Sequence, residues 1–435
     1  MALEKTRGRR LRTGEQAVVV GAGRSGIAAS RLLRRSGAKV RLLDNNPRAF
    51  QGREDLAEEL TALGVEIQLG GHSVQQFDDA SFVVPSPGMP VARLEGLVTA
   101  DATEIVAEME LAWRYLDDEP VLAVTGTSGK TTTASLAAAM LHAQGYDVFL
   151  GGNIGTPLSE YVLSGRKADV LVLEVSSFQL QACSTFCPRA GILLNISPNH
   201  LDYHKDMAEY VEAKFRLFRC QDEGDLAIIG ESLKKETEQR HLKARKVYVG
   251  DGSKRFLHSQ LLGAHNRFNE EAAWQACRFF GVTEKNASRA VAQFVPLPNR
   301  LECVANHKGV LYVNDSKCTT VSSLQVALEA FDRPVRLLCG GKFKGGDLAS
   351  LGNLVQEKVR EVALFGASRE HFEKAWQQLV PMTWHETLEP AVRFLSANAR
   401  EGDVVLLAPA TASFDLYKNY EERGADFRRI VGTLA

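Results

Sequence analysis

Residues 125–132, with the sequence TGTSGKTT, form the segment whose residue types and spacing best suit phosphate chemistry. Glycines let backbone N–H groups turn toward a phosphate, and a helix that begins here adds a favourable dipole. In this pattern Lys130 reaches the β- and γ-phosphates of a nucleotide, and the Thr131 hydroxyl binds Mg²⁺. The full GxxxxGK[ST] pattern needs glycine where the chain has Val124, so the loop is a shortened form. A glycine turn that binds no ligand is the alternative interpretation.

A second glycine-rich turn, GAGRSG at residues 21–26, fits the G-x-G-x-x-G pattern of dinucleotide-binding sheets. Asp44 follows about twenty residues later and suits a ribose-binding carboxylate. The pattern alone favours NAD, and it also occurs in tight strand-to-helix turns that bind nothing. An NAD-dependent oxidoreductase is therefore the main rival to an ATP-using enzyme, but it leaves Lys130 and Thr131 without a role.

Further groups that could do chemistry follow other apolar runs. Glu174 ends such a run, where a carboxylate can hold Mg²⁺ near a phosphate loop. His200 and His204 come after the run at residues 192–195, but single histidines are more often exposed or satisfied in a core. Lys214 lies on a predicted helix and, taken by itself, is interpreted as a solvated lysine.

The elements that must position these groups alternate between strands and amphipathic helices. At about 150 residues per domain, 435 residues predict roughly three domains. Apolar runs predict strands at residues 17–20, 39–43, 82–84, 121–124, 170–173, 192–195, 310–313, 335–338, 361–365 and 404–407. We expect an α/β protein with an N-terminal Rossmann-like domain (1–107), a central P-loop-type ATPase domain (108–297) and a C-terminal Rossmann-like domain (298–435). The polar segment 231–246 is expected to be an exposed helix or excursion.

Composition excludes several classes of protein. Apolar residues make up 45% and charged residues 24%, which is ordinary for a globular protein. A net charge of -1 gives no reason to expect nucleic acid or an anionic membrane as partner. No membrane span is expected, because no run of about 18 apolar residues occurs. No signal peptide is expected either, because glycines and Arg24 interrupt the apolar segment that follows the basic N-terminus. Seven scattered cysteines indicate reduced, mostly buried thiols, and we expect a cytoplasmic monomer.

Taken in order, several segments resemble the Mur ligase family, most closely its members that add D-glutamate. The most specific are TGTSGKTTT (125–133), GGNIGTPL (151–158), EVSSFQL (174–180), NDSKCTT (314–320) and APATASFDLYKNYEERG (408–424). The resemblance covers essentially the whole chain. It implies ATP-dependent addition of D-glutamate to UDP-N-acetylmuramoyl-L-alanine in peptidoglycan precursor synthesis, and hence a part in cell-wall biogenesis, cell shape, cell division and the cell cycle.

The resemblance also implies roles for individual residues. The catalytic group would be Lys130, Glu174, His200 and Lys214. ATP would be bound by Gly126, Thr127, Ser128, Gly129, Lys130, Thr131, Thr132, Asn266, Asn269, Arg300, Asp315 and Lys317. Two Mg²⁺ ions would be held by Thr131, Glu174, His200 and a Lys214 carbamylated by CO₂. The UDP-linked substrate would lie on Arg24, Ser25, Asp44, Asn45, Ser86, Gly88 and Asn153, and the amino acid on Thr319, Lys344, Ser413 and Tyr420.

The implied chemistry has a physical logic. A carboxylate is a poor electrophile until its oxygen becomes part of a phosphate leaving group, so an acyl phosphate forms first and the amine then attacks. Cations offset the charge that develops on the transferred phosphoryl group. Because water would destroy the acyl phosphate, the third domain is expected to close before chemistry.

Four positions depart from the family pattern. Asn199 stands in place of an aspartate, Asn299 of a histidine, Thr320 of an asparagine and Lys342 of another aspartate. These changes leave the amino-acid choice and the ATP affinity open. Ligation of L-glutamate or another amino acid, or a nucleotide-binding regulatory protein with weakened catalysis, are the remaining alternatives.

Overall fold

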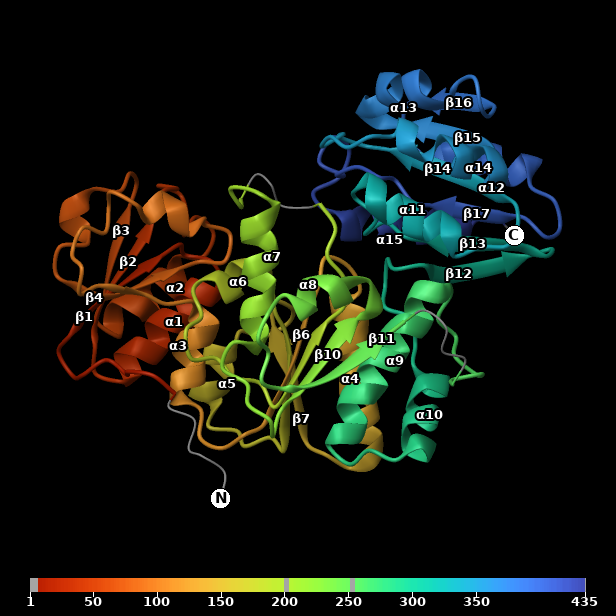
Figure 1. The fold of residues 1–435 in the computed structure, drawn as a ribbon. Coiled ribbons are helices and arrows are strands. Elements are labelled where there is room, and N and C mark those ends of the chain that lie inside the picture. Colours follow the sequence, from red (N-terminus) through yellow and green to blue (C-terminus); the bar gives the residue numbers. More distant parts are fainter. Residues whose placement is uncertain (1–6, 199–202, 251–254, 435) are drawn as a thin grey trace. The chain divides into compact units, whose positions relative to one another are not determined.

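Three sheets, of five, six and six strands, organise the chain in the computed structural model (Figure 1). The structure describes residues 7–198, 203–250 and 255–434. The chain divides into two compact units, a first unit of residues 1–250 and 269–291 and a second unit of residues 251–268 and 292–435. One sheet falls inside each predicted domain range, which confirms the three α/β sheets, while the domain boundaries themselves stay predictions.

The first sheet is parallel and has the strand order β3-β2-β1-β4-β5. Its elements are β1 (Gln16–Val20), α1 (Arg24–Arg35), β2 (Lys39–Asp44), α2 (Glu54–Ala62), β3 (Val65–Leu69), β4 (Ala80–Pro85) and β5 (Glu104–Ile105). Short 3-10 turns lie at Val74–Gln76 and Val91–Leu94. The predicted strands at 17–20, 39–43 and 82–84 are confirmed, because continuous apolar runs suit strands that are buried on both faces.

The second sheet is also parallel, with the order β11-β10-β9-β6-β8-β7. Its strands are β6 (Val121–Thr125), β7 (Val148–Gly152), β8 (Val170–Glu174), β9 (Ala190–Leu193), β10 (Leu226–Gly230) and β11 (Arg245–Val249). The helices are α3 (Glu108–Tyr115), α4 (Lys130–Gln144), α5 (Leu158–Ser164), α6 (Ser177–Gln181), α7 (Met207–Phe215), α8 (Lys234–Glu238), α9 (Ala264–Phe279) and α10 (Glu284–Gln293). The segment 231–246 contains α8 as predicted, but its last residues already belong to β11.

The third sheet has the order β12-β13-β17-β14-β15-β16, and only the β12–β13 pairing is antiparallel. Its strands are β12 (Glu302–His307), β13 (Val310–Asn314), β14 (Val335–Gly340), β15 (Val359–Phe365), β16 (Met382–His385) and β17 (Val404–Leu407). The helices are α11 (Val321–Glu329), α12 (Gly352–Lys358), α13 (Arg369–Trp376), α14 (Leu388–Asn398) and α15 (Tyr420–Val431). The four strands predicted in this range are β13, β14, β15 and β17.

A buried ion-pair network ties the first two sheets together within the first unit. Arg114 of α3 is buried and pairs with Glu104 of β5 and with Glu110. Glu110 in turn accepts the backbone N–H groups of Thr185 (3.0 Å) and Phe186 (2.8 Å). Breaking such a network leaves a buried charge uncompensated, so it stabilises one arrangement of β5, α3 and the loop before β9.

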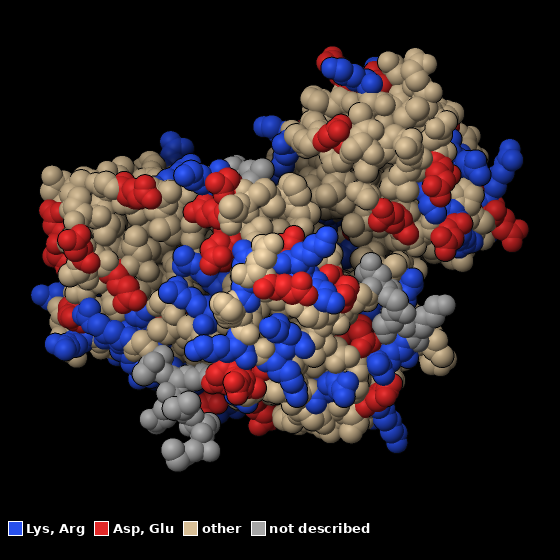
Figure 2. Space-filling model, viewed as in Figure 1, with Lys and Arg blue, Asp and Glu red and all other residues tan. Residues whose placement is uncertain are grey.

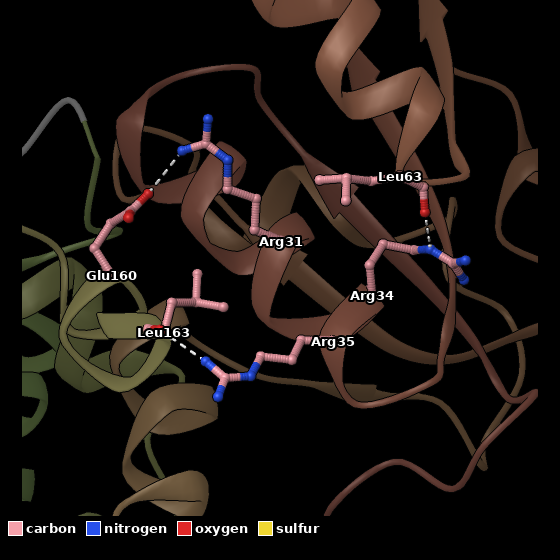
Figure 3. A pocket seen from close by; sticks show the side chains of 6 residues that line it. All are labelled: Arg31, Arg34, Arg35, Leu63, Glu160 and Leu163. Atoms are coloured by element: carbon pink, nitrogen blue, oxygen red, sulfur yellow. Dashed lines mark hydrogen bonds and ion pairs between the residues drawn. The ribbon is translucent and has the colours of Figure 1, made fainter. Parts of the chain in front are cut away.

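A cavity of about 580 Å³ lies where the C-terminal ends of α1 and α5 meet (Figure 3). It is lined by Arg31, Arg34, Arg35, Leu63, Glu160 and Leu163. Arg31 pairs with Glu160 at 3.0 Å, whereas the other two arginines donate to backbone carbonyls, and the three guanidinium groups point apart. Helix C-termini lie at the amino ends of parallel strands, so this cavity is at the opposite edge from the glycine turns and does not belong to the candidate site.

The surface and the thiols follow the composition. Basic and acidic side chains are interspersed on the face drawn in Figure 2, as a net charge of -1 suggests. All seven cysteines are free thiols, and five of them are buried: Cys183, Cys187, Cys277, Cys318 and Cys339. Within the described ranges, none of the helices has the length and apolar character that crossing a membrane requires.

Candidate functional site

The phosphate loop joins β6 to α4, and its glycines cannot be replaced without strain. Gly126 has φ +151°, and a Cβ there would lie 3.0 Å from the Leu194 side chain. Gly129 has φ +85°, and a Cβ there would lie 2.5 Å from Asn269 Oδ1. Asn195 closes the loop from the other side: its Oδ1 accepts the Ser128 N–H (2.9 Å) and its backbone carbonyl accepts that of Thr127 (2.9 Å). The loop is therefore held open toward a phosphate by its neighbours.

Glu174 lies at the end of β8 and brings two of the predicted residues together. Its Oε2 accepts the Thr131 hydroxyl at 2.6 Å, and its Oε1 accepts the Asn153 amide at 2.7 Å. Glu174 is buried, and β6 and β8 are neighbours in the sheet. A hydroxyl and a carboxylate oxygen beside a phosphate loop are the hard donors that Mg²⁺ takes from proteins, so the residues present fit that ion. Its remaining ligands would be phosphate oxygens and water.

Two lysines share one acceptor on this loop. Lys130 Nζ donates to the carbonyl oxygens of Gly126 and Thr127, each at 3.0 Å. Lys214 Nζ, from α7, donates to Gly126 at 2.9 Å and lies 4.7 Å from the Tyr210 ring centroid. The interpretation of Lys214 as a solvated lysine is wrong, because the residue is only 2% exposed. Its aliphatic chain is covered by the loop and by the rest of α7.

The electrostatics at Lys214 favour the neutral amine. Burial lowers the pKa of Lys214 well below its usual value, the charge of Lys130 lowers it further, and Glu174 opposes both. A buried cation next to another cation is unfavourable, which is the physical reason for this direction. Tyr210 completes the enclosure, since its hydroxyl lies 3.0 Å from Thr127 Oγ1. The site thus favours the neutral form of the amine, which is the nucleophilic one, more than an exposed position does.

The two histidines that the sequence analysis singled out, His200 and His204, differ in what the structure describes of them. His200 and the departure Asn199 lie outside the described residues. His204 is buried, and its Nε2 lies 2.9 Å from the Ser177 hydroxyl of α6. Within the described ranges, no three His, Cys, Asp or Glu side chains form a group that could hold a metal. A metal at this site would therefore depend on hydroxyl, phosphate and water ligands as well as Glu174.

The N-terminal glycine turn gathers the residues that the resemblance assigns to the UDP-linked substrate. Gly21 has φ +106°, and a Cβ there would lie 2.3 Å from Ser86 Oγ, so the turn and the loop after β4 are in contact. Asp44 Oδ2 accepts the Ala22 N–H at 2.7 Å, which fixes the turn. Arg24 is exposed at the start of α1. The predicted group Arg24, Ser25, Asp44, Asn45, Ser86 and Gly88 thus lies at or just beyond the carboxyl edge of this sheet.

In the second unit, the predicted residues follow the carboxyl ends of three adjacent strands, β13, β17 and β14. These residues are Asp315, Lys317, Thr319, Lys344, Ser413 and Tyr420. Lys317 Nζ lies 3.9 Å from the Tyr420 ring centroid, and Lys344 Nζ lies 5.8 Å from that of Phe414. Phe414 is 65% exposed, so Lys344 faces open surface.

Asp315 is the titratable residue of this edge. Burial raises its pKa to about 7, while a hydrogen bond from the Leu301 N–H and the charge of Arg300 act in the opposite direction. Arg300 and Asp315, both predicted to bind ATP, therefore interact electrostatically. Asn266 belongs to the second unit and donates to Leu262 O at 2.7 Å, whereas Asn269 lies in the first unit.

Three of the departures have structural partners. Asn299 Oδ1 accepts the Asn314 amide at 2.9 Å. Thr320 caps α11 by accepting the Ser323 N–H, which an asparagine at this position would also do. Lys342 is exposed, and its backbone pairs with Ala412 in both directions. None of these three contacts involves a residue of the phosphate loop.

Sequence reasoning missed two residues that shape the site. Asn195 was assigned to a strand, yet β9 ends at Leu193 and the asparagine braces the phosphate loop. Arg423 is fully buried and donates to Ser316 (Oγ, 3.0 Å), Thr411 O (3.1 Å) and Gly340 O (3.3 Å). Burial lowers the pKa of Arg423 to about 10. No spacing rule distinguishes these two residues from surface asparagines and arginines.

Comparisons with known proteins place this chain in a family. Three family models match: the Mur ligase MurD-like N-terminal domain at residues 15–106, the Mur ligase middle domain at 124–268, and the Mur ligase glutamate ligase domain at 299–411. A UDP-N-acetylmuramoylalanine--D-glutamate ligase of Desulfovibrio desulfuricans is 76% identical over 100% of both chains. Another, of Oleidesulfovibrio alaskensis, is 55% identical over 97% of this chain and 94% of its own.

Solved structures show the same fold. The MurF ligase of Thermotoga maritima, in complex with ADP, has a TM-score of 0.62 and 20% identity over 91% of this chain and 96% of its own. A pseudomurein peptide ligase type C of Methanothermus fervidus has a TM-score of 0.55 and 17% identity over 97% of this chain and 100% of its own. With three matching family models and near-full-length relatives, the chain belongs to the Mur ligase family.

Proposed function

We propose that this chain is a UDP-N-acetylmuramoyl-L-alanine:D-glutamate ligase that uses ATP and forms ADP and phosphate. The observation that carries the proposal is the Lys130, Thr131 and Glu174 arrangement on the phosphate loop, in a chain 76% identical to a protein named as such a ligase. The reaction serves peptidoglycan precursor synthesis, and we expect the enzyme to act in the cytoplasm as a monomer.

The chain's own residues perform distinct tasks in this reaction. Lys130 supplies a positive charge and N–H donors to the phosphoryl group as the substrate carboxylate attacks it and becomes an acyl phosphate. The Glu174 and Thr131 oxygens would hold the first Mg²⁺, and His200 with Lys214 would hold the second. Bound Mg²⁺ offsets the charge of the phosphates. The amine of glutamate then attacks the acyl carbon, and phosphate leaves.

We propose further that Lys214 acts as its carbamate. Carbamylation needs the neutral amine, and the burial of Lys214 beside Lys130 favours that form. The carbamate nitrogen keeps one hydrogen, which suits the Gly126 carbonyl that the amine contacts at 2.9 Å. The modification replaces a cation by an anion with hard oxygen atoms, the donors that Mg²⁺ prefers.

The direct test is phosphate release with UDP-N-acetylmuramoyl-L-alanine and a panel of D- and L-amino acids. We expect release to require ATP and D-glutamate, with L-glutamate giving little. Equal or faster phosphate release with another amino acid would identify that amino acid, and not D-glutamate, as the substrate. ATP binding without release for any amino acid would favour the weakened, regulatory alternative.

The first prediction concerns Lys344, which we assign to a carboxylate of glutamate. Replacing it with methionine keeps most of the side-chain volume but removes the charge, and a lost charge-assisted hydrogen bond of about 1.5–3 kcal/mol corresponds to roughly 10- to 150-fold. We expect the KM for glutamate to rise by at least about tenfold, with the KM for the UDP-linked substrate within about twofold.

Steady-state kinetics with each substrate varied in turn gives this measurement. Lys374→Met is the matched control, since Lys374 is also an exposed lysine of the second unit but lies on α13. It should leave all KM values unchanged. Equal rises in both KM values for Lys344→Met would assign Lys344 to the nucleotide instead.

The second prediction separates UDP from NAD at the N-terminal turn. Arg24 and Ser25 place a cation and a hydroxyl at the first positions of α1, where a diphosphate is favoured by the helix dipole. We expect calorimetry to show UDP binding that is weakened by Arg24→Ala, and no binding of NADH at the same concentrations. Tight NADH binding with no response to UDP would revive the oxidoreductase.

A further inference from the structure

Tyr203 links the two nucleotide-binding halves of the first unit by a single side chain. Its hydroxyl donates to the backbone carbonyl of Met89 at 2.8 Å. Its ring stacks on Phe178, with centroids 3.7 Å apart and planes 27° apart. Met89 follows β4 of the first sheet, and Phe178 lies on α6 of the second. The tyrosine thus holds a loop of one sheet against a helix of the other.

The helix end of this link is rigidly attached to the catalytic carboxylate. Phe178 is four residues after Glu174, and only the N-cap and the first residue of α6 follow Val175 before it. Ser176 caps α6 in a reciprocal box with Gln179. His204, the neighbour of Tyr203, reaches the Ser177 hydroxyl at 2.9 Å, which fixes the tyrosine from a second direction.

The loop end is rigidly attached to the glycine turn. Ser86 donates from its backbone N–H to Val20 O (2.8 Å) and from its hydroxyl to Gly21 O (3.2 Å). The Met89 N–H closes a turn on Ser86 O at 2.9 Å. A displacement at the Met89 carbonyl is therefore transmitted to Ser86 and Gly21 rather than absorbed in a slack loop.

Tyr203 can act as a donor throughout the neutral range. Burial, with a smaller contribution from Glu209, raises the pKa of its hydroxyl to about 12. The aromatic pair supplies apolar contact in addition to the hydrogen bond, because stacked rings stabilise one another beyond their buried area. The link needs no ligand or metal to form.

We propose that Tyr203 is a positioning residue for the UDP-linked substrate, which fixes the distance between the Ser86–Met89 loop and Glu174. The inference rests on the proposed function, because only a substrate that spans both sheets senses that distance. Its nucleotide end lies on the loop side, and its reacting carboxylate must reach the phosphate loop. UDP alone occupies the loop side and does not sense the link.

Tyr203→Phe tests this third prediction, since it removes the hydroxyl and keeps the stacked ring. Loss of one net hydrogen bond predicts a rise of about three- to tenfold in the KM for UDP-N-acetylmuramoyl-L-alanine. The KM values for ATP and glutamate, and the dissociation constant of UDP by calorimetry, should stay within about twofold. Tyr203→Ala also removes the stack and should raise the same KM by more than about tenfold.

Tyr146→Phe is the matched control. Tyr146 likewise donates from its hydroxyl to a backbone carbonyl, that of Phe280 at 2.6 Å. This bond joins the residues that follow α4 to the residue that follows α9. It should leave every KM unchanged. Equal weakening of UDP and full substrate by Tyr203→Phe, or no change in either, would overturn the positioning role while wild-type activity still supports the proposed function. An inactive wild type would overturn both.

Discussion

Lys130→Ala is expected to lower phosphate release by at least about a hundredfold, the scale on which one preorganised donor to a developing charge acts. In the structure the ammonium group donates to the carbonyl oxygens of Gly126 and Thr127, so it already points into the phosphate loop. A bound phosphate would take over these donors. The effect should appear mainly in kcat, because the charge to be stabilised develops in the transition state.

The fold should survive this change. Lys130 is half-buried at the first position of α4, and alanine is a good helix former there. We expect the free energy of unfolding, from denaturant titration, to change by no more than about 1 kcal/mol. Lys285→Ala is the control, since Lys285 is an exposed lysine in the first turn of α10. Wild-type phosphate release in Lys130→Ala would refute the assignment of the loop to ATP.

Most central strands could be predicted from the sequence, whereas the edge strands and the central strand β10 (Leu226–Gly230) were not predicted. β1, β6 and β8 are buried along nearly their whole length, so their sequences are uninterrupted apolar runs. β3 and β16 lie at sheet edges, where most residues of β3 and all residues of β16 are at least partly exposed and polar residues interrupt the pattern. The sequence pattern therefore predicts the number and type of the sheets, but not how many strands each sheet contains.

The candidate site divides in the same way. Lys130 and Thr131 could be named because their chemistry depends on local spacing within one turn and one helix. The burial of Lys214 depends on how α7 packs on the phosphate loop, which no local pattern encodes, and only the family resemblance pointed to it. Arg423 is even harder to predict from local sequence, since its acceptors lie at the carboxyl ends of three different strands.

The departures also depend on tertiary contacts. Asn299 has φ +63°, a conformation that asparagine tolerates better than most residues. Its side-chain oxygen accepts a hydrogen bond from the Asn314 amide. A residue chosen for backbone conformation need not alter the reaction. Thr320 is likewise a helix cap, so neither change by itself supports weakened catalysis. Asn199 is different, because the family pattern has an aspartate here, and the resemblance implies that its negative charge lies beside the proposed metal site.

Lys214→Ala is expected to lose activity by about a hundredfold or more, because the proposed second Mg²⁺ would then lack the anionic ligand that we assign to the Lys214 carbamate. A cation at this position would repel the metal. Because alanine also leaves a cavity where a buried side chain lay, Lys214→Met should be measured beside it. Methionine fills most of the space but cannot be carbamylated, so it should lose the same activity with a smaller change in the free energy of unfolding. Lys205→Ala, at an exposed lysine just before α7, should behave as wild type.

The dependence of the activity on carbon dioxide tests the same prediction without any mutation. Enzyme depleted of CO₂ should lose activity and recover it when bicarbonate is added, whereas Lys214→Met should respond to neither treatment. Only the neutral amine reacts with CO₂, and burial lowers the pKa of Lys214, so at a fixed concentration of dissolved CO₂ recovery should become faster as the pH rises through that lowered pKa and then level off. ¹³C NMR after equilibration with labelled bicarbonate should show a carbamate signal that is absent from Lys214→Met. Full activity of Lys214→Met, or wild-type activity that is indifferent to CO₂ with no carbamate signal, would show that the buried amine serves only to brace Gly126. In that case the proposed second Mg²⁺ would need another anion, and Asn199, which replaces the aspartate of the family pattern, would not supply one.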